Sequence, residues 1–218
     1  MNLEGGKLET ALTDDELGSD PTLSFGTWFE EAKNAGIHEP NAMCLATSSP
    51  DGTPSARMVL LHSFDQRGFV WYTNYESRKA SEIELNPKAA LVFYWQSLNR
   101  SVRIEGSVVR ITSEESDAYF NSRPLDSKLG AWTSRQSRPI PDRKALEDAL
   151  ATTRLRFLGT ATTNEGETLI PRPQFWGGYR LIPQRIEFWK SRPARLHDRL
   201  SYSRDQSSST WTKSRLQP

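Results

Sequence analysis

Cysteine and histidine are both scarce in this sequence of 218 residues. Cys44 is the one cysteine, which excludes an internal disulfide and a metal site built on several cysteines. The three histidines, His38, His62 and His197, lie far apart and show no metal-ligand spacing. We therefore expect no bound metal, and the low cysteine content is typical of a reducing compartment.

Long hydrophobic runs are also missing. No apolar stretch approaches the ~18–20 residues that cross a bilayer, and the first residues lack the basic-then-apolar order of a signal peptide. No glycine-rich fingerprint joins a strand to a helix, which argues against a Rossmann dinucleotide site. We expect a soluble, cytoplasmic protein without a membrane partner.

An excess of charge of one sign is absent as well, because the formal net charge is +1. This value offers no overall attraction to nucleic acid, so no nucleic-acid partner is expected. The charges are unevenly placed: residues 1–20 contain six acidic side chains and one lysine, whereas the chain from Ser191 onward is rich in arginine. The acidic segment 1–20 is predicted to be a mobile N-terminal arm, and residues 21–218 a single domain.

Strand signals dominate the rest of the chain. Apolar or alternating runs bounded by turn residues predict strands over 42–48, 55–64, 69–74, 89–95, 100–111, 179–182, 185–189, 199–203 and 211–215. Helices are predicted from Pro21, from Ser77 to about Asn86, from a capping box at Thr112 and from Pro141. Many strands with a few interspersed helices favour a mostly β, α+β fold: a β-barrel with peripheral helices rather than a doubly wound sheet.

Two cationic residues open the helix that follows the strand 69–74. The sequence Ser77-Arg78-Lys79 places both cations in the first turn, where positive charge opposes the helix macrodipole. This placement is favourable if an anion binds there, held by backbone N–H groups and the two side chains. The alternative is a solvated helix start that tolerates a small energetic cost.

The segment Arg195-Leu196-His197-Asp198-Arg199 concentrates charge near the C-terminus. On a strand, alternation places Arg195, His197 and Arg199 on one face. Two guanidinium groups and an imidazole repel one another unless an anion lies between them, such as a phosphate or an electron-rich ring that carries one. A solvated edge strand with scattered charge is the alternative.

Three weaker sequence signals also indicate anion binding. Tyr119 and Arg123 lie four residues apart on one helical face, and with the Ser127 hydroxyl they form a potential phosphate cup; a polar helix cap is the alternative. Gln136-Ser137 lies between two arginines, and aromatic residues border paired glycines in Phe175-Trp176-Gly177-Gly178-Tyr179. Together the signals predict at least two phosphate-sized anion sites with aromatic walls, and hence a phosphorylated cofactor and a phosphorylated substrate.

In these segments the chain resembles the pyridoxamine 5′-phosphate oxidase family, from about Trp28 to Pro218. The motifs that carry the resemblance are Arg57–Leu61, Tyr72-Thr73-Asn74, Ser77-Arg78-Lys79, Tyr119-Phe120-x-Ser122-Arg123-Pro124, Gly130-Ala131-Trp132, Arg135-Gln136-Ser137, Trp176-Gly177-Gly178, Ile186-Glu187-Phe188-Trp189 and Arg195–Arg199. The resemblance implies an FMN-binding split β-barrel of antiparallel strands, with FMN at a homodimer interface. It also implies oxidation of pyridoxamine or pyridoxine 5′-phosphate to pyridoxal 5′-phosphate, with O₂ reduced to H₂O₂.

The resemblance also assigns residues to the site, position by position. The implied FMN contacts are Arg57, Met58, Val59, Leu60, Leu61, Tyr72, Thr73, Arg78, Lys79, Ser101, Gln136, Ser137, Trp176 and Arg199. The implied substrate contacts are His62, Tyr119, Arg123, Ser127, Arg195, Leu196 and His197. Arg195 and His197 would be the catalytic pair, because they would press the substrate ring against the flavin.

Two positions depart from the family pattern. His62 stands where the family usually has a lysine on the substrate phosphate, and Ser101 where it usually has a glutamine that reaches the flavin. The departures leave two alternatives open. One is a related flavin oxidase of the phenazine-biosynthesis type, and the other is a non-catalytic binder of flavin or pyridoxal phosphate.

Overall fold

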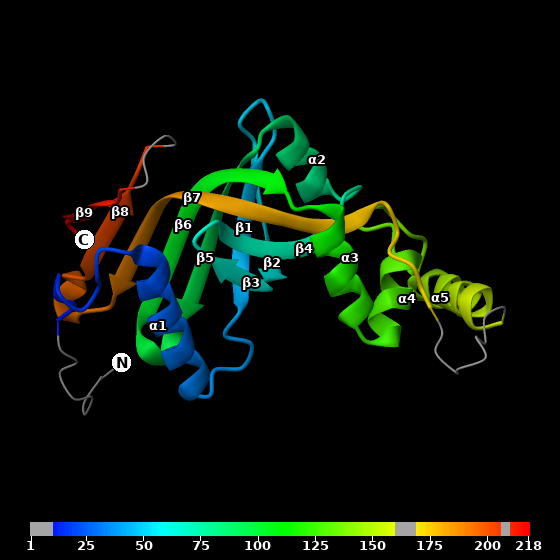
Figure 1. The fold of residues 1–218 in the computed structure, drawn as a ribbon, viewed down its shortest axis with the longest axis horizontal. Helices are drawn as coiled ribbons and strands as arrows, with labels where there is room; N and C mark the ends of the chain where they lie inside the picture. Colours follow the sequence, from blue (N-terminus) through cyan, green and yellow to red (C-terminus); the bar gives the residue numbers. More distant parts are fainter. Residues whose placement is uncertain (1–10, 160–168, 206–209) are drawn as a thin grey trace.

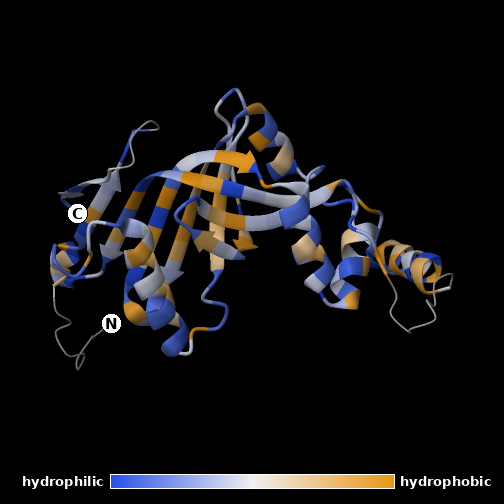
Figure 2. Cartoon of the chain, in the orientation of Figure 1, coloured by the Kyte–Doolittle hydropathy of each residue, from blue (hydrophilic) through white to orange (hydrophobic). Residues whose placement is uncertain are grey.

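A nine-stranded, fully antiparallel sheet organises the part of the chain that the computed structural model describes, residues 11–159, 169–205 and 210–218 (Figure 1). The strands are β1 (Ala42–Ser48), β2 (Pro54–Leu60), β3 (Ser63–Asp65), β4 (Gly68–Asn74), β5 (Lys88–Trp95), β6 (Arg100–Arg110), β7 (Trp176–Lys190), β8 (Asp198–Ser203) and β9 (Thr212–Arg215). Their order is β2-β1-β5-β6-β7-β4-β3, and β8 pairs with both β7 and β9. Hydrophobic and polar residues alternate along these strands in Figure 2, as expected where one face of a sheet is buried.

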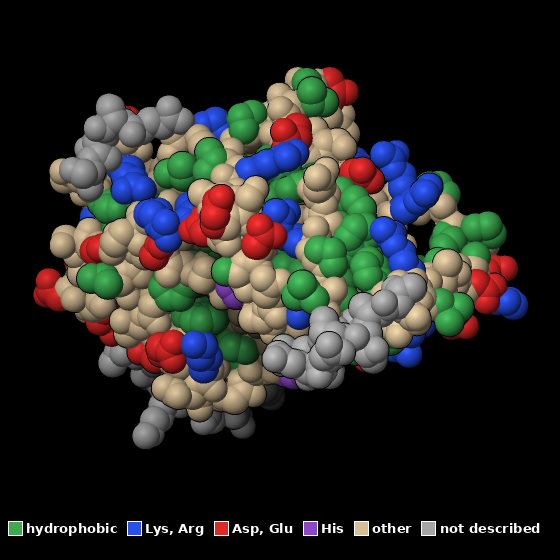
Figure 3. Space-filling view, turned by 45° about the vertical axis from the view of Figure 1, so that its right-hand side comes forward, with side chains coloured by type: hydrophobic (Ala, Val, Ile, Leu, Met, Phe, Trp, Pro, Cys, Tyr) green, Lys and Arg blue, Asp and Glu red, His purple; other side chains and the backbone are tan. Residues whose placement is uncertain are grey.

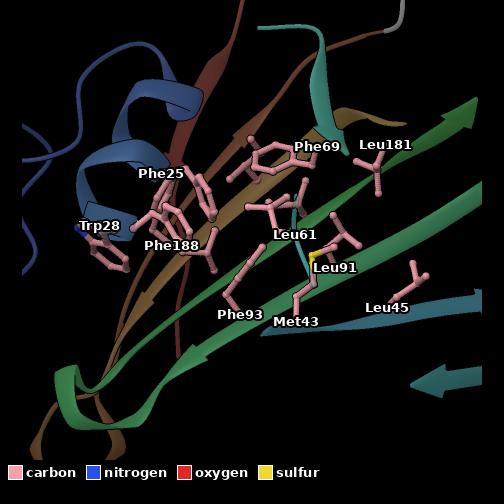
Figure 4. Close-up of a cluster of buried hydrophobic side chains, with 14 of the residues drawn as sticks. Phe25, Trp28, Met43, Leu45, Leu61, Phe69, Leu91, Phe93, Leu181 and Phe188 are labelled. Carbon is pink, nitrogen blue, oxygen red and sulfur yellow. The ribbon is translucent and has the colours of Figure 1, made fainter. Parts of the chain in front are cut away.

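Helix α1 (Pro21–Asn34) covers the hydrophobic core of this sheet. It begins as predicted at Pro21, where the Asp20 carboxylate accepts hydrogen bonds from the first-turn N–H groups. Phe25 packs edge-on against Phe69, and Trp28 packs in the same way against Phe188 (Figure 4). The core therefore joins an early helix to strands from the middle and the end of the chain.

Strand β7 is the longest of the described strands and connects the two ends of the molecule (Figure 1). Its first residues pair with β4 and its last residues with β8, while β6 pairs along its length. The sequence predicted two strands here, 179–182 and 185–189, and this prediction is wrong. A register shift between Glu105 and Gly106 of β6 accommodates Pro183, so the strand passes through the proline as a bulge instead of ending there.

The predicted strand 55–64 is divided in two. β2 pairs with β1 and β3 pairs with β4, at opposite ends of the sheet order, so the chain must leave one partner before it joins the other. The break falls at Leu61 and His62, whose N–H groups donate to Asn41 and Val70. His62 therefore lies in the short linker between β2 and β3.

Four further helices complete the fold: α2 (Arg78–Leu85), α3 (Ser113–Ser122), α4 (Leu125–Thr133) and α5 (Arg143–Leu158). The capping box predicted at Thr112 is present, with Glu115 as its partner. Helix α4, which starts three residues after α3 ends, was not predicted. Phe120, Leu129, Ile170 and Trp176 form a second, smaller core beneath α3 and α4.

Residues 11–20 differ from the predicted mobile arm. Leu12 and Leu17 are buried in the main core, and Tyr202 of β8 donates from its hydroxyl to the Leu17 carbonyl oxygen. The Leu12 N–H donates to the Asp198 carboxylate. Two leucines in an otherwise polar segment are therefore enough to attach it to β8. Residues 1–10 of the predicted arm lie outside the described residues.

None of the described helices is long and apolar enough to cross a membrane. Within the same described ranges, no group of three or more His, Cys, Asp or Glu side chains could hold a metal ion.

Candidate active site

A buried lysine marks the first part of the site. Lys79 lies in the first turn of α2 and is only 7% exposed. Its Nζ donates to three neutral oxygens, Gln136 Oε1 at 2.6 Å, Thr73 Oγ1 at 3.2 Å and Ser77 Oγ at 3.4 Å. Burial, followed by the nearby charge of Arg57, lowers the pKa of Lys79 to about 8. A buried ammonium group held by neutral partners is well prepared to receive an anion.

Ser77 precedes this turn and supports the same interpretation. It is the N-cap of α2, yet its side chain makes no capping hydrogen bond. The first N–H groups of the helix are therefore available to an external acceptor, as the sequence analysis predicted for this position.

Aromatic side chains form the wall next to the lysine. Tyr72 stacks on Trp176 with ring centroids 5.2 Å apart, Tyr119 lies 4.2 Å from Tyr72, and His62 lies 4.0 Å from Tyr119. Although the His62 side chain is partly exposed, the crowding of these rings desolvates it and lowers its pKa below the usual value. The imidazole is therefore predominantly neutral at pH 7 in the free protein.

These residues enclose a cavity of about 510 Å³. It is lined by Asn41, Arg57, Met58, Val59, Leu60, Leu61, His62, Tyr72, Thr73, Lys79, Tyr119, Arg123, Gln136 and Trp176. Figure 3 shows Lys and Arg side chains bordering a hydrophobic patch toward the helical end of the molecule. Cations beside flat apolar walls suit a ligand that carries both a phosphate and a ring.

A second, smaller cavity of about 260 Å³ adjoins the first and shares Arg123, Gln136 and Trp176 with it. Ser127 of α4 also lines it. The Arg123 guanidinium lies 4.7 Å from the centre of the Trp176 ring, and its buried Nη1 has no hydrogen-bond partner among the described residues. Burial lowers the pKa of Arg123 from its usual value. An unpaired buried guanidinium nitrogen is costly unless a ligand accepts from it.

A third cavity, of about 440 Å³, gathers the C-terminal site residues. Ser101, His197 and Arg199 line it, together with Trp189 and Glu187. Arg199 binds the Glu187 carboxylate through Nε at 2.8 Å and Nη2 at 3.1 Å. The His197 ring lies 4.7 Å from Trp189.

One hydrogen bond defines the tautomer of His197. Its Nδ1 accepts from the Arg192 N–H at 3.1 Å. The proton of the neutral imidazole must then be on Nε2, which can act as a donor toward a ligand.

The predicted alternation over Arg195–Arg199 is wrong in its first half. Pro193–Arg195 form a short 3₁₀ turn, and β8 begins only at Asp198. Ala194 and Arg195 have φ values of 55° and 61°, the left-handed region that non-glycine residues rarely adopt. Arg195 and Leu196 are consequently exposed and project from a turn instead of from a strand face.

A single chain does not assemble all the predicted site residues. Trp176 at the first cavity and Glu187 at the third are eleven residues apart on β7, up to about 36 Å along a straight strand. In the sheet order, β1, β5, β6 and β7 separate Arg57 on β2 from Arg199 on β8. We call the first two cavities the lysine half-site and the third the arginine–histidine half-site.

Four predicted residues line none of the three cavities: Arg78, Ser137, Arg195 and Leu196.

The sequence analysis assigned no site role to two buried carboxylates, Glu82 and Glu187. Glu82 binds Arg57 and Arg78, and Glu187 binds Arg103 and Arg199. The spacing of Arg78 and Glu82, four residues apart on one helix, was a signal for the first pair. No local sequence pattern predicts the contact between Arg57 and Glu82, because the two residues lie on different elements that the fold brings together.

Comparison with known proteins shows the family of the chain. A sequence profile described as pyridoxamine 5′-phosphate oxidase matches residues 29–157, and one described as the pyridoxine 5′-phosphate oxidase C-terminal dimerisation region matches residues 176–218. The pyridoxine/pyridoxamine 5′-phosphate oxidase of Rubrobacter xylanophilus is 56% identical over 207 residues, which are 95% of this chain and 91% of the relative. The protein of the same name from Salinibacter ruber is 50% identical over 207 residues, 95% of this chain and 93% of the relative.

Solved structures share the fold. PhzG from Burkholderia lata, crystallised with tetrahydrophenazine-1-carboxylic acid, superposes with a TM-score of 0.85 at 32% identity, covering 98% of this chain and all of PhzG. An FMN-binding protein from Nostoc punctiforme superposes with a TM-score of 0.67 at 17% identity, over 92% of this chain and all of that protein. The fold is thus the split β-barrel of FMN-binding proteins, with peripheral helices, as predicted. Within that class, the chain belongs to the pyridoxamine 5′-phosphate oxidase family, which confirms the resemblance seen in the sequence.

Proposed function

We propose that this protein is an FMN-dependent oxidase that converts pyridoxamine or pyridoxine 5′-phosphate to pyridoxal 5′-phosphate and reduces O₂ to H₂O₂. The observation that carries the proposal is a pair of adjoining cationic cavities that share Trp176. One contains the buried Lys79 and the other the unpaired Nη1 of Arg123. Two phosphates, one on the cofactor and one on the substrate, account for both cations.

The residues fit FMN at the first cavity. Lys79 and Arg57 would bind the phosphate, with Gln136 and Thr73 beside them, and the apolar residues of β2 would lie along the flavin. The flavin supplies the redox chemistry, accepting electrons from the substrate and passing them to O₂. The protein would contribute position and charge: Arg123, Tyr119 and Ser127 would bind the substrate phosphate.

A homodimer would complete the site. Met58 and Leu60 are 66% and 50% exposed on one face of the edge strand β2, an unusual position for two large apolar side chains. The region matched to the dimerisation profile contains the arginine–histidine half-site. We infer that a second copy brings Arg195, His197 and Arg199 to the lysine half-site. There His197 and Arg195 would hold the substrate ring against the flavin, close enough for transfer of two electrons and a proton.

The main alternative is an oxidase of the phenazine type, since PhzG superposes over nearly the whole chain. The cavity lined by Arg123 and Ser127 favours a phosphorylated substrate instead. A non-catalytic binder is the other alternative. His197, with Nδ1 occupied and Nε2 available to a ligand, favours an oxidase over a passive binder.

The deciding experiment is an absorption spectrum of the FMN-loaded protein under anaerobic conditions. Pyridoxine 5′-phosphate should bleach the flavin band, and readmitted O₂ should restore it with formation of H₂O₂. Unphosphorylated pyridoxine at the same concentration should bleach it far more slowly. Bleaching by both compounds at equal rates would argue against a phosphate-directed site, and no bleaching by either would contradict the oxidase assignment.

A further inference from the structure

We propose that Glu82 is a positioning residue of the phosphate cradle, by which we mean Lys79 and Arg57 at the first cavity. Its buried carboxylate holds Arg57 in place for the anion that Lys79 binds, and it also contacts Arg78 at the start of α2. The proposal rests on the proposed function, because it takes the anion to be the FMN phosphate. Neither the family resemblance nor the cavity lining assigns Glu82 any role. Its side chain is 8% exposed, so it is withdrawn from water and reached mainly by its protein partners.

One carboxylate oxygen of Glu82 acts on Arg57 directly and through two hydroxyl groups. Glu82 Oε2 accepts from Arg57 Nη2 at 3.3 Å, from Ser55 Oγ at 2.6 Å and from Thr47 Oγ1. The same two hydroxyls accept from Arg57, Thr47 from Nη1 and Ser55 from Nη2. Each hydroxyl therefore accepts a hydrogen bond from the guanidinium and donates one to the carboxylate. Both Nη atoms of Arg57 are fixed by this arrangement.

The other oxygen of Glu82 acts on Arg78. Glu82 Oε1 accepts from Arg78 Nε at 2.9 Å, one helical turn away. Although 64% of the Arg78 side chain is exposed, this ion pair restrains its guanidinium group. A single carboxylate thus contacts two arginines, one from β2 and one from α2. Arg57 lines the first cavity with Lys79, so the contact with Arg57 is the one that bears on the anion site.

The charges of the cradle support a positioning role. Burial alone would raise the pKa of Glu82, but the hydrogen bonds from Ser55, Thr47 and Arg78 outweigh it and lower that pKa to about 2. Glu82 is therefore ionised at every pH at which the protein would work. Its negative charge partly offsets the repulsion between Arg57 and Lys79 before an anion arrives.

A different role for Glu82 makes the opposite prediction. If Glu82 were only a counter-charge, it would compete with the phosphate, and its neutralisation would strengthen FMN binding. If it positions the arginines, neutralisation releases them and weakens FMN binding. The sign of the change separates the two roles.

The test compares Glu82→Gln with Glu84→Gln in full-length protein stripped of flavin. Glu84 lies on the same helix but pairs with Arg110 and the Tyr179 hydroxyl, outside the cradle. Titration with FMN, followed by quenching of flavin fluorescence, should show affinity at least about tenfold lower for Glu82→Gln, as for a lost hydrogen bond to a charged group. Riboflavin, which lacks the phosphate, should bind both variants and the wild type equally.

A pH series adds a readout that a merely structural role would not change. The charged groups acting on Lys79 are Arg57, which lowers its pKa, and Glu82, which raises it; Thr73, Ser77 and Gln136 contact it as neutral groups. Removal of the Glu82 charge lowers the Lys79 pKa further. FMN affinity should then begin to fall at a lower pH in Glu82→Gln than in the wild type, where it falls above about pH 8.

The binding measurements decide between the positioning role and its alternatives. Equal or tighter FMN binding by Glu82→Gln overturns the positioning role, and so does an equal loss of riboflavin binding, which would indicate general damage. If the wild type itself binds no FMN, the proposed function fails as well, and the two failures are thereby distinguished. Should Glu82→Gln not fold, Ser55→Ala removes one hydroxyl bridge and should weaken FMN binding about two- to tenfold; unchanged binding would again overturn the proposal.

Discussion

Two residues in this protein are held in states that are unfavourable in the free protein. Lys79 is buried with a pKa lowered to about 8, and Arg123 has a buried nitrogen without a partner in the described chain. Both arrangements cost stability in the free protein, since buried charges and unpaired donors are unfavourable. Such costs are typical of binding sites, where the ligand supplies the missing interaction.

His62 leads to a prediction about pH. Crowding by neighbouring rings lowers its pKa in the free protein, whereas a nearby substrate phosphate should raise it in the complex. Substrate binding would then take up a proton, so the KM for pyridoxine 5′-phosphate should rise as pH increases from the lowered pKa of the free protein, below the usual 6.5, to the raised pKa of the complex. The phosphate's own second ionisation, near pH 6, opposes this trend at the acid end.

The control is His62→Lys, because a lysine stays charged to about pH 10. This variant should have a flatter KM profile above neutrality and a lower KM at pH 8. Identical profiles for the two proteins between pH 6.5 and 8.5 would mean that His62 acts through its stacking on Tyr119 and does not contact the phosphate.

At the level of elements, the β6–β7 pair determines the geometry of the whole sheet. Its register shifts between Glu105 and Gly106, opposite Pro183, and beyond this bulge β7 exchanges β4 for β8 as its second partner. A bulge bends the strand that contains it and strengthens its twist. The same long strand can therefore contribute to both half-sites.

Gly106→Ala tests this interpretation. A Cβ at Gly106 would lie 2.0 Å from the Ile182 carbonyl oxygen, a clash with backbone that no side-chain rotation relieves. We expect the free energy of unfolding to fall by roughly 2–4 kcal/mol, the range of mutations that break packing in a core. Urea or thermal denaturation measures it.

Gly26→Ala in α1 is the matched control. Its added Cβ would meet only the Phe64 ring, at an ordinary 3.5 Å, inside a helix. It should therefore stabilise the protein by about 0.5–1 kcal/mol. Equal effects of the two substitutions would show that the bulge tolerates a side chain.

In the whole molecule, the predicted site residues lie in two separated half-sites. If two copies pair them, each active site takes one half from each chain. A variant defective in the lysine half-site, such as Arg123→Ala, and one defective in the arginine–histidine half-site, such as His197→Ala, should each have little activity.

A heterodimer of these two variants, purified with two different tags, should recover about half of the wild-type activity, because one of its two sites contains only intact residues. Oxygen uptake with pyridoxine 5′-phosphate measures the recovery. A heterodimer no more active than its parents would show that each chain forms its own site.

Features that depend on neighbouring residues were predictable from the amino-acid sequence. The start of α1 at Pro21, the capping box at Thr112 and the strands 42–48 and 69–74 agree with prediction within one residue, because local propensity and capping decide them. The ordered motifs also identified the family. The cations Arg78 and Lys79 at the start of α2 predict an anion site from their position alone, and this stays a prediction.

Contacts between distant segments were not predictable, because they depend on how the strands are ordered in the fold. The bond between Arg57 and Glu82, the packing of Leu12 and Leu17 on the core, and the division of the site along β7 depend on strand order and register. These involve residues tens of positions apart, whose contacts no local pattern encodes. The turn at Ala194 and Arg195 belongs with them, because its left-handed backbone opposes the local preference of both residues and requires the surrounding fold to hold it.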